Sequence, residues 1–201
     1  MTDLINDLRN LNVLVLHPRD ADADDLIQQV NRIGCSVEAL WPLPENLPVG
    51  VDLIFVEVKE SVSPELTRLL SNNVMTRPTV IGIIGYENPS VLQGMLDLSV
   101  QTVLSKPLRA FGVMGSMLMA RRIWHEKRED LRNIDKIKLK LENIQAIVEA
   151  KFILMRHHGI NDKDAYNVIR SHAMARRTST RDIAHAIINA DGLLNNFQIK
   201  K

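Results

Sequence analysis

The chain is poor in cysteine, in aromatic residues and in long apolar segments. Its 201 residues include one cysteine, and aromatic side chains make up 4% of the total. Cys35 therefore cannot form an internal disulfide, and its apolar neighbours predict that it lies in the core. No apolar run reaches the roughly 18–20 residues that span a bilayer, and the first ten residues lack the basic-then-apolar order of a signal peptide. We expect a soluble protein that stays in the cytoplasm.

Several motifs of enzymes and cofactor sites are also missing. The chain has no Gly-x-Gly-x-x-Gly, no Walker A lysine motif and no Gly-x-Ser-x-Gly. Its six histidines are poorly spaced for metal binding, since the adjacent His157 and His158 point about 100° apart on a helix. The sequence therefore predicts no metal site and no cofactor.

The net charge of +1 hides a division between the two halves of the chain. Residues 1–118 contain 8 Lys and Arg against 14 Asp and Glu, whereas residues 119–201 contain 17 against 10. Such asymmetry is a cue for nucleic-acid binding by the basic half. Solvated helix faces would produce the same count, so the charge alone leaves both interpretations open.

Residues 12–107 alternate short, β-rich apolar runs with helical patterns. The expected strands lie in the segments NVLVLHP, CSVEALW, VDLIFVEV, TVIGIIGY and QTVLSKP. Continuously apolar strands are typical of a parallel sheet that helices cover on both faces. Five of them in about a hundred residues predict an α/β flavodoxin-like fold with strand order 2-1-3-4-5.

This half resembles the receiver domain of bacterial response regulators, most clearly in the Lys106-Pro107 pair after the fifth strand. The rest of the receiver's phosphorylation site departs from the pattern. Its acidic pair, its phosphoacceptor aspartate and its Ser or Thr are replaced here by His17 and Pro18, by Glu57, and by Ile84.

These replacements predict that the site is not phosphorylated. Phosphoryl transfer needs a hard cation held by oxygen ligands, but Pro18 offers no side-chain ligand and the neutral imidazole of His17 prefers softer metals. The carboxylate of Glu57 also lies one methylene further out than an aspartate. We expect Lys106 to pair with Glu57 instead, in a fixed structural contact.

A helical pattern continues from Leu108 with no Pro or Gly between Ser116 and Arg156. Apolar residues follow a 3-4 spacing within it, at Leu131, Ile134, Ile137, Leu141, Ile144 and Val148. The spacing predicts a coiled coil over residues 119–148 and therefore a homodimer. The alternative is a long helix that packs on its own domain.

The stretch from Ala150 to Ile188 has the pattern of three short helices with a shared core. Gly159 fits a helix stop, and Asn161 and Ser179 fit helix N-caps. The expected core residues are Phe152, Leu154, Met155, Ala165, Val168, Ile169, Ala173, Ile183, Ala184, Ile187 and Ile188.

This stretch resembles the ANTAR domain, the RNA-binding module of bacterial transcription antiterminators. The resemblance depends on the Ala-Lys-x-x-Leu-Met start at Ala150, on Gly159, and on the run from Ala165 to Met174. The order of receiver-like domain (1–118), coiled coil (119–148) and all-α ANTAR bundle (149–201) is similar to amidase-operon antiterminators.

That family implies a regulator without enzymatic activity. Its ANTAR dimer binds paired hairpins in a nascent leader mRNA and prevents the terminator hairpin from forming. A ligand-sensing partner of periplasmic-binding-protein type sequesters the regulator until a small ligand arrives. Two alternatives remain at this point, namely a phosphorylation-dependent regulator with the same output, and a protein-interaction scaffold without RNA.

Basic residues beside an aromatic ring suit RNA loops, where phosphates are neutralised and bases stack. The second and third expected helices of the ANTAR-like stretch carry basic residues near Tyr166. The same residues would also fit an ordinary helix surface exposed to solvent. The candidate RNA-binding residues are Lys151, Lys163, Tyr166, Asn167, Arg170, Arg176, Arg177, Arg181 and His185.

Overall fold

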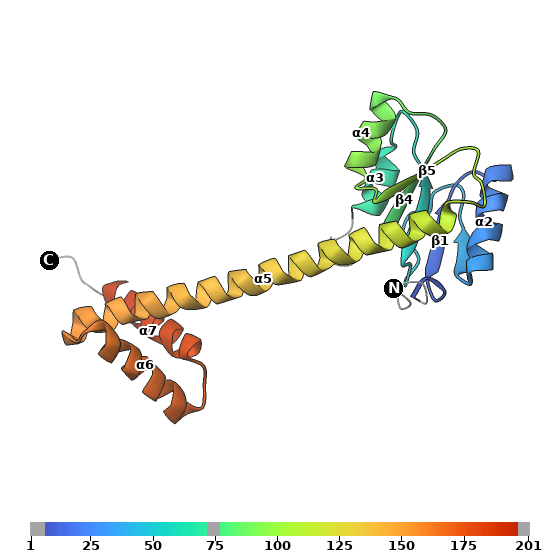
Figure 1. Cartoon of the computed structure of the whole chain (residues 1–201). Helices are drawn as coiled ribbons and strands as arrows, with labels where there is room; N and C mark the ends of the chain where they lie inside the picture. The colour runs from blue at the N-terminus through green and yellow to red at the C-terminus, as the bar shows by residue number, and fades with distance from the viewer. Residues whose placement is uncertain (1–6, 72–76, 197–201) are drawn as a thin grey trace. The chain divides into compact units, whose positions relative to one another are not determined.

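The computed structural model describes residues 7–71 and 77–196, with side chains to residue 193 in the last helix. The chain forms two compact units, residues 1–129 and 130–201, and Figure 1 shows their elements. Within the described ranges, no helix is both long and apolar enough to cross a membrane.

The first unit is built on a parallel sheet of five strands. They are β1 (Asn12–Leu16), β2 (Ser36–Ala39), β3 (Leu53–Glu57), β4 (Thr79–Ile84) and β5 (Thr102–Ser105). Their order in the sheet is β2-β1-β3-β4-β5, and every neighbouring pair is parallel. The predicted flavodoxin-like order 2-1-3-4-5 is therefore confirmed.

Helices cover both faces of this sheet (Figure 1). On one face, α2 (Ala21–Ile33) and the first turns of α5 (Val113–His158) pack in one apolar cluster. On the other face, α3 (Pro64–Leu70) and α4 (Pro89–Asp97) pack in a second cluster. Because helices exclude water from both faces of the sheet, β3 and β4 are apolar at almost every position. Cys35 lies in the first cluster, as predicted, and burial raises the pKa of its thiol.

The contacts of the first unit extend along α5 beyond its first apolar turns. Arg121 is only 8% exposed, and its guanidinium donates to Thr79 Oγ1 at 3.1 Å. One turn later, the indole of Trp124 donates to the carbonyl oxygen of Arg77 at 2.7 Å. These two bonds attach α5 to β4 and to the segment that precedes it.

The second unit consists of the remainder of α5 with α6 (Asp162–Arg176) and α7 (Thr180–Asn196). The first of the three expected short helices is thus the end of the 46-residue α5 and not a separate helix. Small side chains dominate the core, which lets the helices approach closely. Its buried members are Ala146, Ala150, Ile169, Ala173, Ile183 and Ala184.

The prediction that Phe152 lies in the core of this unit is wrong. Phe152 is 64% exposed, whereas Ala146, Ala150 and the partly buried Leu154 face the bundle. The reason is helical phase, because two residues correspond to about 200° of rotation on an α-helix. Phe152 therefore points away from the side that Ala150 buries.

The predicted ends of the helices are confirmed. Gly159 follows α5 with a φ of +65°, a conformation that suits a residue without Cβ. The side chain of Asn161 accepts a hydrogen bond from the backbone N–H of Asp164 at 2.9 Å. Ser179 Oγ accepts one from the N–H of Asp182 at 3.1 Å.

Candidate functional site

Charged side chains meet at the carboxyl ends of β3 and β5, where a receiver keeps its phosphorylation site. Lys106 Nζ lies 2.6 Å from Glu57 Oε1, so the predicted ion pair is present. Lys59 Nζ lies 3.0 Å from the other carboxylate oxygen, Oε2. One carboxylate is therefore held between two ammonium groups.

Electrostatics keep this carboxylate ionised. Burial raises the pKa of Glu57, but the hydrogen bond and charge of Lys106, aided by Lys59, outweigh burial and leave the pKa below its usual range. The pKa of Asp20 is also lowered. Burial raises it, but the hydrogen bond from the Ala23 N–H and the charges of His17 and Lys106 have the larger combined effect.

The other replaced positions offer no place for a hard cation. His17 is 2% exposed, and its Nδ1 lies 2.7 Å from the carbonyl oxygen of Pro18. Because a carbonyl oxygen only accepts, Nδ1 carries the proton, and Nε2 faces Glu57 at 3.7 Å. Ile84 is buried in the second apolar cluster. Across the described residues, no three His, Cys, Asp or Glu side chains are grouped to hold a metal.

Sequence reasoning missed one member of this site. Asp20 lies 3.7 Å from Lys106 Nζ and also caps α2 by accepting from the Ala23 N–H. The signal was available, because an aspartate directly before a helical pattern is a common N-cap. Asp20 and Glu57 together surround the ammonium group of Lys106 with negative charge.

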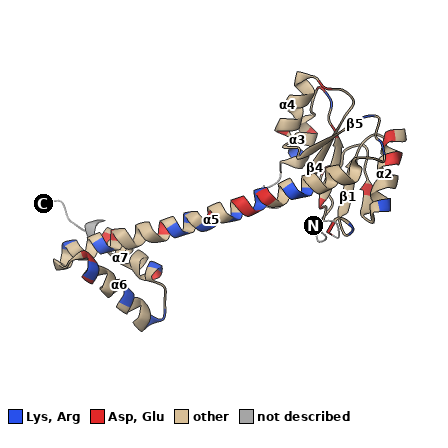
Figure 2. Cartoon of the chain, in the orientation of Figure 1, with Lys and Arg blue, Asp and Glu red and all other residues tan. Residues whose placement is uncertain are grey.

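The predicted dimer stripe runs along the part of α5 that belongs to the second unit. Leu131 is half-buried, and the other members are between 39% and 64% exposed: Ile134, Ile137, Leu141, Ile144 and Val148. Phe152, at 64%, extends this row by one turn. The folded single chain thus leaves an apolar row uncovered on a helix that also carries many charged side chains (Figure 2).

The candidate RNA-binding residues of α6 separate into two groups. The exposed residues at 3-4 spacing on one side of the helix are Lys163, Tyr166, Asn167 and Arg170. Together with Arg177, the exposed C-cap residue that follows α6, they are called the α6 flank below. They lie beside the buried row formed by Ala165, Ile169 and Ala173. Tyr166 is 41% exposed, so its ring is open to solvent among the cations. Arg176 lies on another side of the helix, where it lines a pocket.

Lys151, Arg181 and His185 have contacts within the second unit. Lys151 Nζ lies 2.5 Å from Asp162 Oδ1, and its side chain is 18% exposed. This ion pair joins α5 to the first turn of α6. Arg181 lies 3.9 Å from Glu142, and its Nε donates to His185 Nε2 at 3.4 Å. Lys151 is therefore less accessible than Arg181, whose side chain is 40% exposed.

A second charged cluster, which sequence reasoning missed, joins α7 to the end of α5. Arg156 donates to both carboxylate oxygens of Asp191, at 2.6 and 2.7 Å, and His157 Nε2 lies 2.8 Å from Oδ1. The hydrogen bonds from Arg156 and His157 lower the pKa of Asp191. Partners 34 and 35 residues apart leave no local pattern in the sequence.

Comparisons with known proteins cover both units. Residues 11–121 match the family of AmiR N-terminal domains, and residues 135–188 match the ANTAR domain. The aliphatic amidase regulator of Pseudomonas aeruginosa is 33% identical over 186 residues, which are 92% of this chain and 94% of that protein.

Solved structures that are similar to this chain include two from signalling proteins. The signal receiver domain of a modulated diguanylate cyclase from Desulfovibrio desulfuricans has 16% identity and a TM-score of 0.46, covering 59% of this chain and 98% of that one. A response regulator from Thermotoga maritima has 13% identity and a TM-score of 0.45, covering 55% and 97%. From the two domain matches and the full-length relative, we conclude that the chain belongs to the family of AmiR-like antiterminator regulators with an ANTAR domain.

Proposed function

We propose that this regulator binds paired hairpins in a nascent leader mRNA through the α6 flank and so prevents a terminator hairpin from forming. The observation that supports this most is the exposed tyrosine of that flank, Tyr166, among Lys163, Arg170 and Arg177. Cations neutralise phosphates, and an exposed ring stacks on an unpaired base of a loop. The protein has no enzymatic role in this scheme.

The uncovered apolar row on α5 supports a homodimer, with one hairpin for each protomer. Exposed Ile and Leu at 3-4 spacing on a helix are stabilised when a second helix covers them. Residues 119–148 of the two protomers then hold two ANTAR bundles together, one bundle for each of the two hairpins in a leader. Binding of both hairpins becomes partly intramolecular and therefore tighter than binding of one.

The site around Glu57 is consistent with control by a protein partner. His17 and Pro18 supply no side-chain oxygen ligand for a hard cation, and the carboxylate of Glu57 is paired with two lysines, so in our proposal the signal does not enter by phosphorylation. In our proposal, a ligand-sensing protein of periplasmic-binding-protein type sequesters the regulator until a small ligand releases it. The regulator works in the cytoplasm, where leader transcripts are made.

Binding of labelled RNA by the full chain tests the RNA-binding role. A two-hairpin RNA should bind more tightly than an unstructured RNA of equal length, and the affinity should fall as salt is raised. Arg170→Ala should weaken binding and reduce the salt slope by about 1. Arg68→Ala, which removes an exposed arginine from α3, is the matched control and should leave both unchanged. Equal affinity for hairpin and unstructured RNA would contradict the proposal.

The two other candidate functions make different predictions. Incubation with acetyl phosphate and Mg²⁺ should leave the mass of the chain unchanged, whereas a phosphorylation-dependent regulator would gain one phosphoryl group. A protein scaffold would show no preference for hairpin RNA at any salt concentration. The pairing of the Glu57 carboxylate with two lysines argues against the first alternative.

A further inference from the structure

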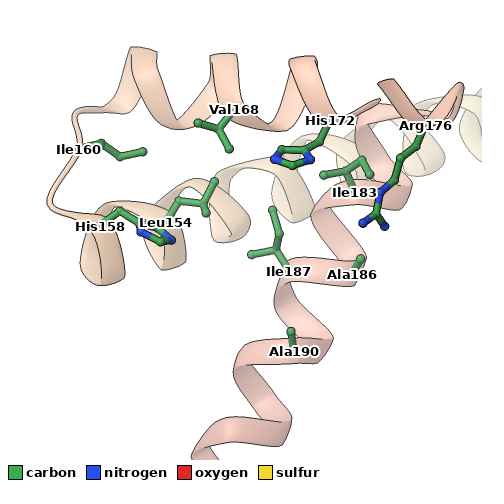
Figure 3. A pocket seen from close by; sticks show the side chains of 10 residues that line it. All are labelled: Leu154, His158, Ile160, Val168, His172, Arg176, Ile183, Ala186, Ile187 and Ala190. Carbon is green, nitrogen blue, oxygen red and sulfur yellow. The ribbon is translucent and has the colours of Figure 1, made fainter. Parts of the chain in front are cut away.

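The second unit contains a pocket of about 590 Å³ between the end of α5, α6 and α7 (Figure 3). Its apolar lining comes from all three helices and includes Leu154, Val168, Ile183 and Ile187. The volume lies within the roughly 300–1000 Å³ that is common for sites of small organic groups. The bundle therefore leaves an apolar recess that it does not fill with its own described side chains.

Three nitrogen-bearing planar groups border this recess, namely the imidazoles of His158 and His172 and the guanidinium of Arg176. The lining contains no acidic residue. Among the residues that the structure describes, none forms a hydrogen bond or ion pair with Arg176, His158 or His172. Cationic and donor groups at the mouth of an apolar recess favour an occupant with a flat apolar body, hydrogen-bond acceptors and negative charge.

Arg176 and Arg177 place this recess next to the α6 flank. Arg176 is the last residue of α6, and Arg177 follows it in the left-handed conformation, with a φ of +52°. Arg176 lines the pocket, while Arg177 lies on the flank. The C-terminal end of α6 also attracts cations and is thus a natural place for two adjacent arginines. The two arginines are adjacent in the chain, so the α6 flank ends beside a residue of the pocket lining.

From this arrangement we propose that the pocket receives an unstacked base from the loop of the bound RNA hairpin. The base lies against Leu154 and Ile187, one of its edges bonds to His172, and Arg176 binds the adjoining phosphate. The inference rests on the proposed RNA-binding function and adds a second contact surface to the α6 flank. Loop bases are the parts of a hairpin that can be splayed out, and imidazole and guanidinium planes stack on them.

An acidic amphipathic peptide is the other occupant with suitable chemistry. In Figure 3, His172 and Arg176 lie one turn apart on α6, and His158 lies at the far end of the lining. We favour a base because Arg176, in the lining, is adjacent in the chain to Arg177 of the α6 flank, which we propose to bind RNA.

Ala190 offers a way to fill the pocket without removing any core contact. It lines the pocket but is exposed on α7, so Ala190→Phe places a ring in the recess and leaves Arg176 in position. Ala175→Phe adds the same ring to an exposed position of α6 outside the lining and is the matched control. The test measures binding of the full chain to two-hairpin RNAs that carry one abasic site at each loop position in turn, which removes a base but keeps its phosphate.

We expect Ala190→Phe to weaken binding of the intact RNA about tenfold, as the loss of one stacked base would, and Ala175→Phe to have no effect. One abasic position should weaken binding to the unmodified protein by a similar factor and should have no further effect on Ala190→Phe. If Ala190→Phe binds intact RNA as tightly as the unmodified protein does, the pocket receives no base, although the α6 flank still binds RNA. If the unmodified protein does not prefer hairpin RNA, the proposed function fails as well. Circular dichroism confirms that both variants fold.

Discussion

Glu57 and Lys106 should stabilise the first unit jointly, and a double-mutant cycle measures the coupling. The four proteins are the unmodified chain, Glu57→Gln, Lys106→Met and the double variant. We expect a coupling free energy of about 1–2 kcal/mol between the two side chains. The full chain is suitable because both tryptophans, Trp41 and Trp124, belong to the first unit. Tryptophan fluorescence during urea unfolding therefore reports that unit by itself.

The magnitude follows from the partial burial of the pair. The side chains of Glu57 and Lys106 are 13% and 18% exposed, and their charged atoms lie 2.6 Å apart. Exposed ion pairs contribute about 0–1 kcal/mol, whereas removing one partner of a fully buried pair costs about 3–5 kcal/mol. This pair lies between those limits. Lys59 stays beside Glu57 in the Lys106→Met variant and limits the loss.

The pH dependence of the coupling provides an independent check on its origin. Because the native pKa of Glu57 is lowered from 4.5, the unfolded chain binds the proton more readily than the folded chain does. The contribution is therefore complete above the ordinary glutamate pKa and is lost as the pH falls through the lower native value. A coupling near zero at pH 7, or one that persists in acid after Glu57 is protonated, would refute the ion pair as a source of stability.

Four further substitutions test the second unit and the dimer. Leu141→Asp should shift the full chain from dimer to monomer in sedimentation velocity, because it places a charge in the uncovered apolar row; a dimer unchanged by this variant would exclude the row as the interface. Gly159→Ala should destabilise the second unit by about 1 kcal/mol, because alanine is strained at positive φ, whereas Gly192→Ala within α7 should stabilise it by up to about 1 kcal/mol. Equal effects of these two variants on thermal unfolding followed by circular dichroism would contradict the backbone argument. Asn161→Ala should cost about 1 kcal/mol in the same assay through loss of the α6 N-cap, and an unchanged midpoint would show that the cap contributes nothing.

The sheet and its ion pair were predictable because strand alternation determines which residues meet. Once five parallel strands are assigned, Glu57 falls at the carboxyl end of β3 and Lys106 directly after β5, so both lie at the same edge of the sheet, and the resemblance to a receiver predicts that they meet. Phe152 was assigned wrongly because α5 has two apolar faces. One packs in the bundle through Ala150, and the other continues the exposed row past Val148. Periodicity shows that both faces exist, but it does not show which one a residue near their boundary joins.

Other parts of the candidate site depend on contacts between residues far apart in the sequence. The bond between Lys151 and Asp162 depends on how α6 folds back after Gly159, and Asp191 meets Arg156 only when α7 packs on α5. No local pattern specifies either pair. The pocket lined by Arg176 also depends on the distances between three helices. The spacing of apolar residues in the sequence does not predict those distances.

The ion pair of Glu57 has a consequence for how quickly such a regulator can respond. A phosphorylated aspartate is a timer, because hydrolysis erases it at a characteristic rate whatever the other components are doing. A glutamate held by two lysines has no such lifetime. Under control by a partner protein, the duration of a response is set by the dissociation rate of the complex, and its amplitude by the number of regulator copies in excess of the partner. The cell would then adjust this switch through the relative production of two proteins and not through a kinase and a phosphatase.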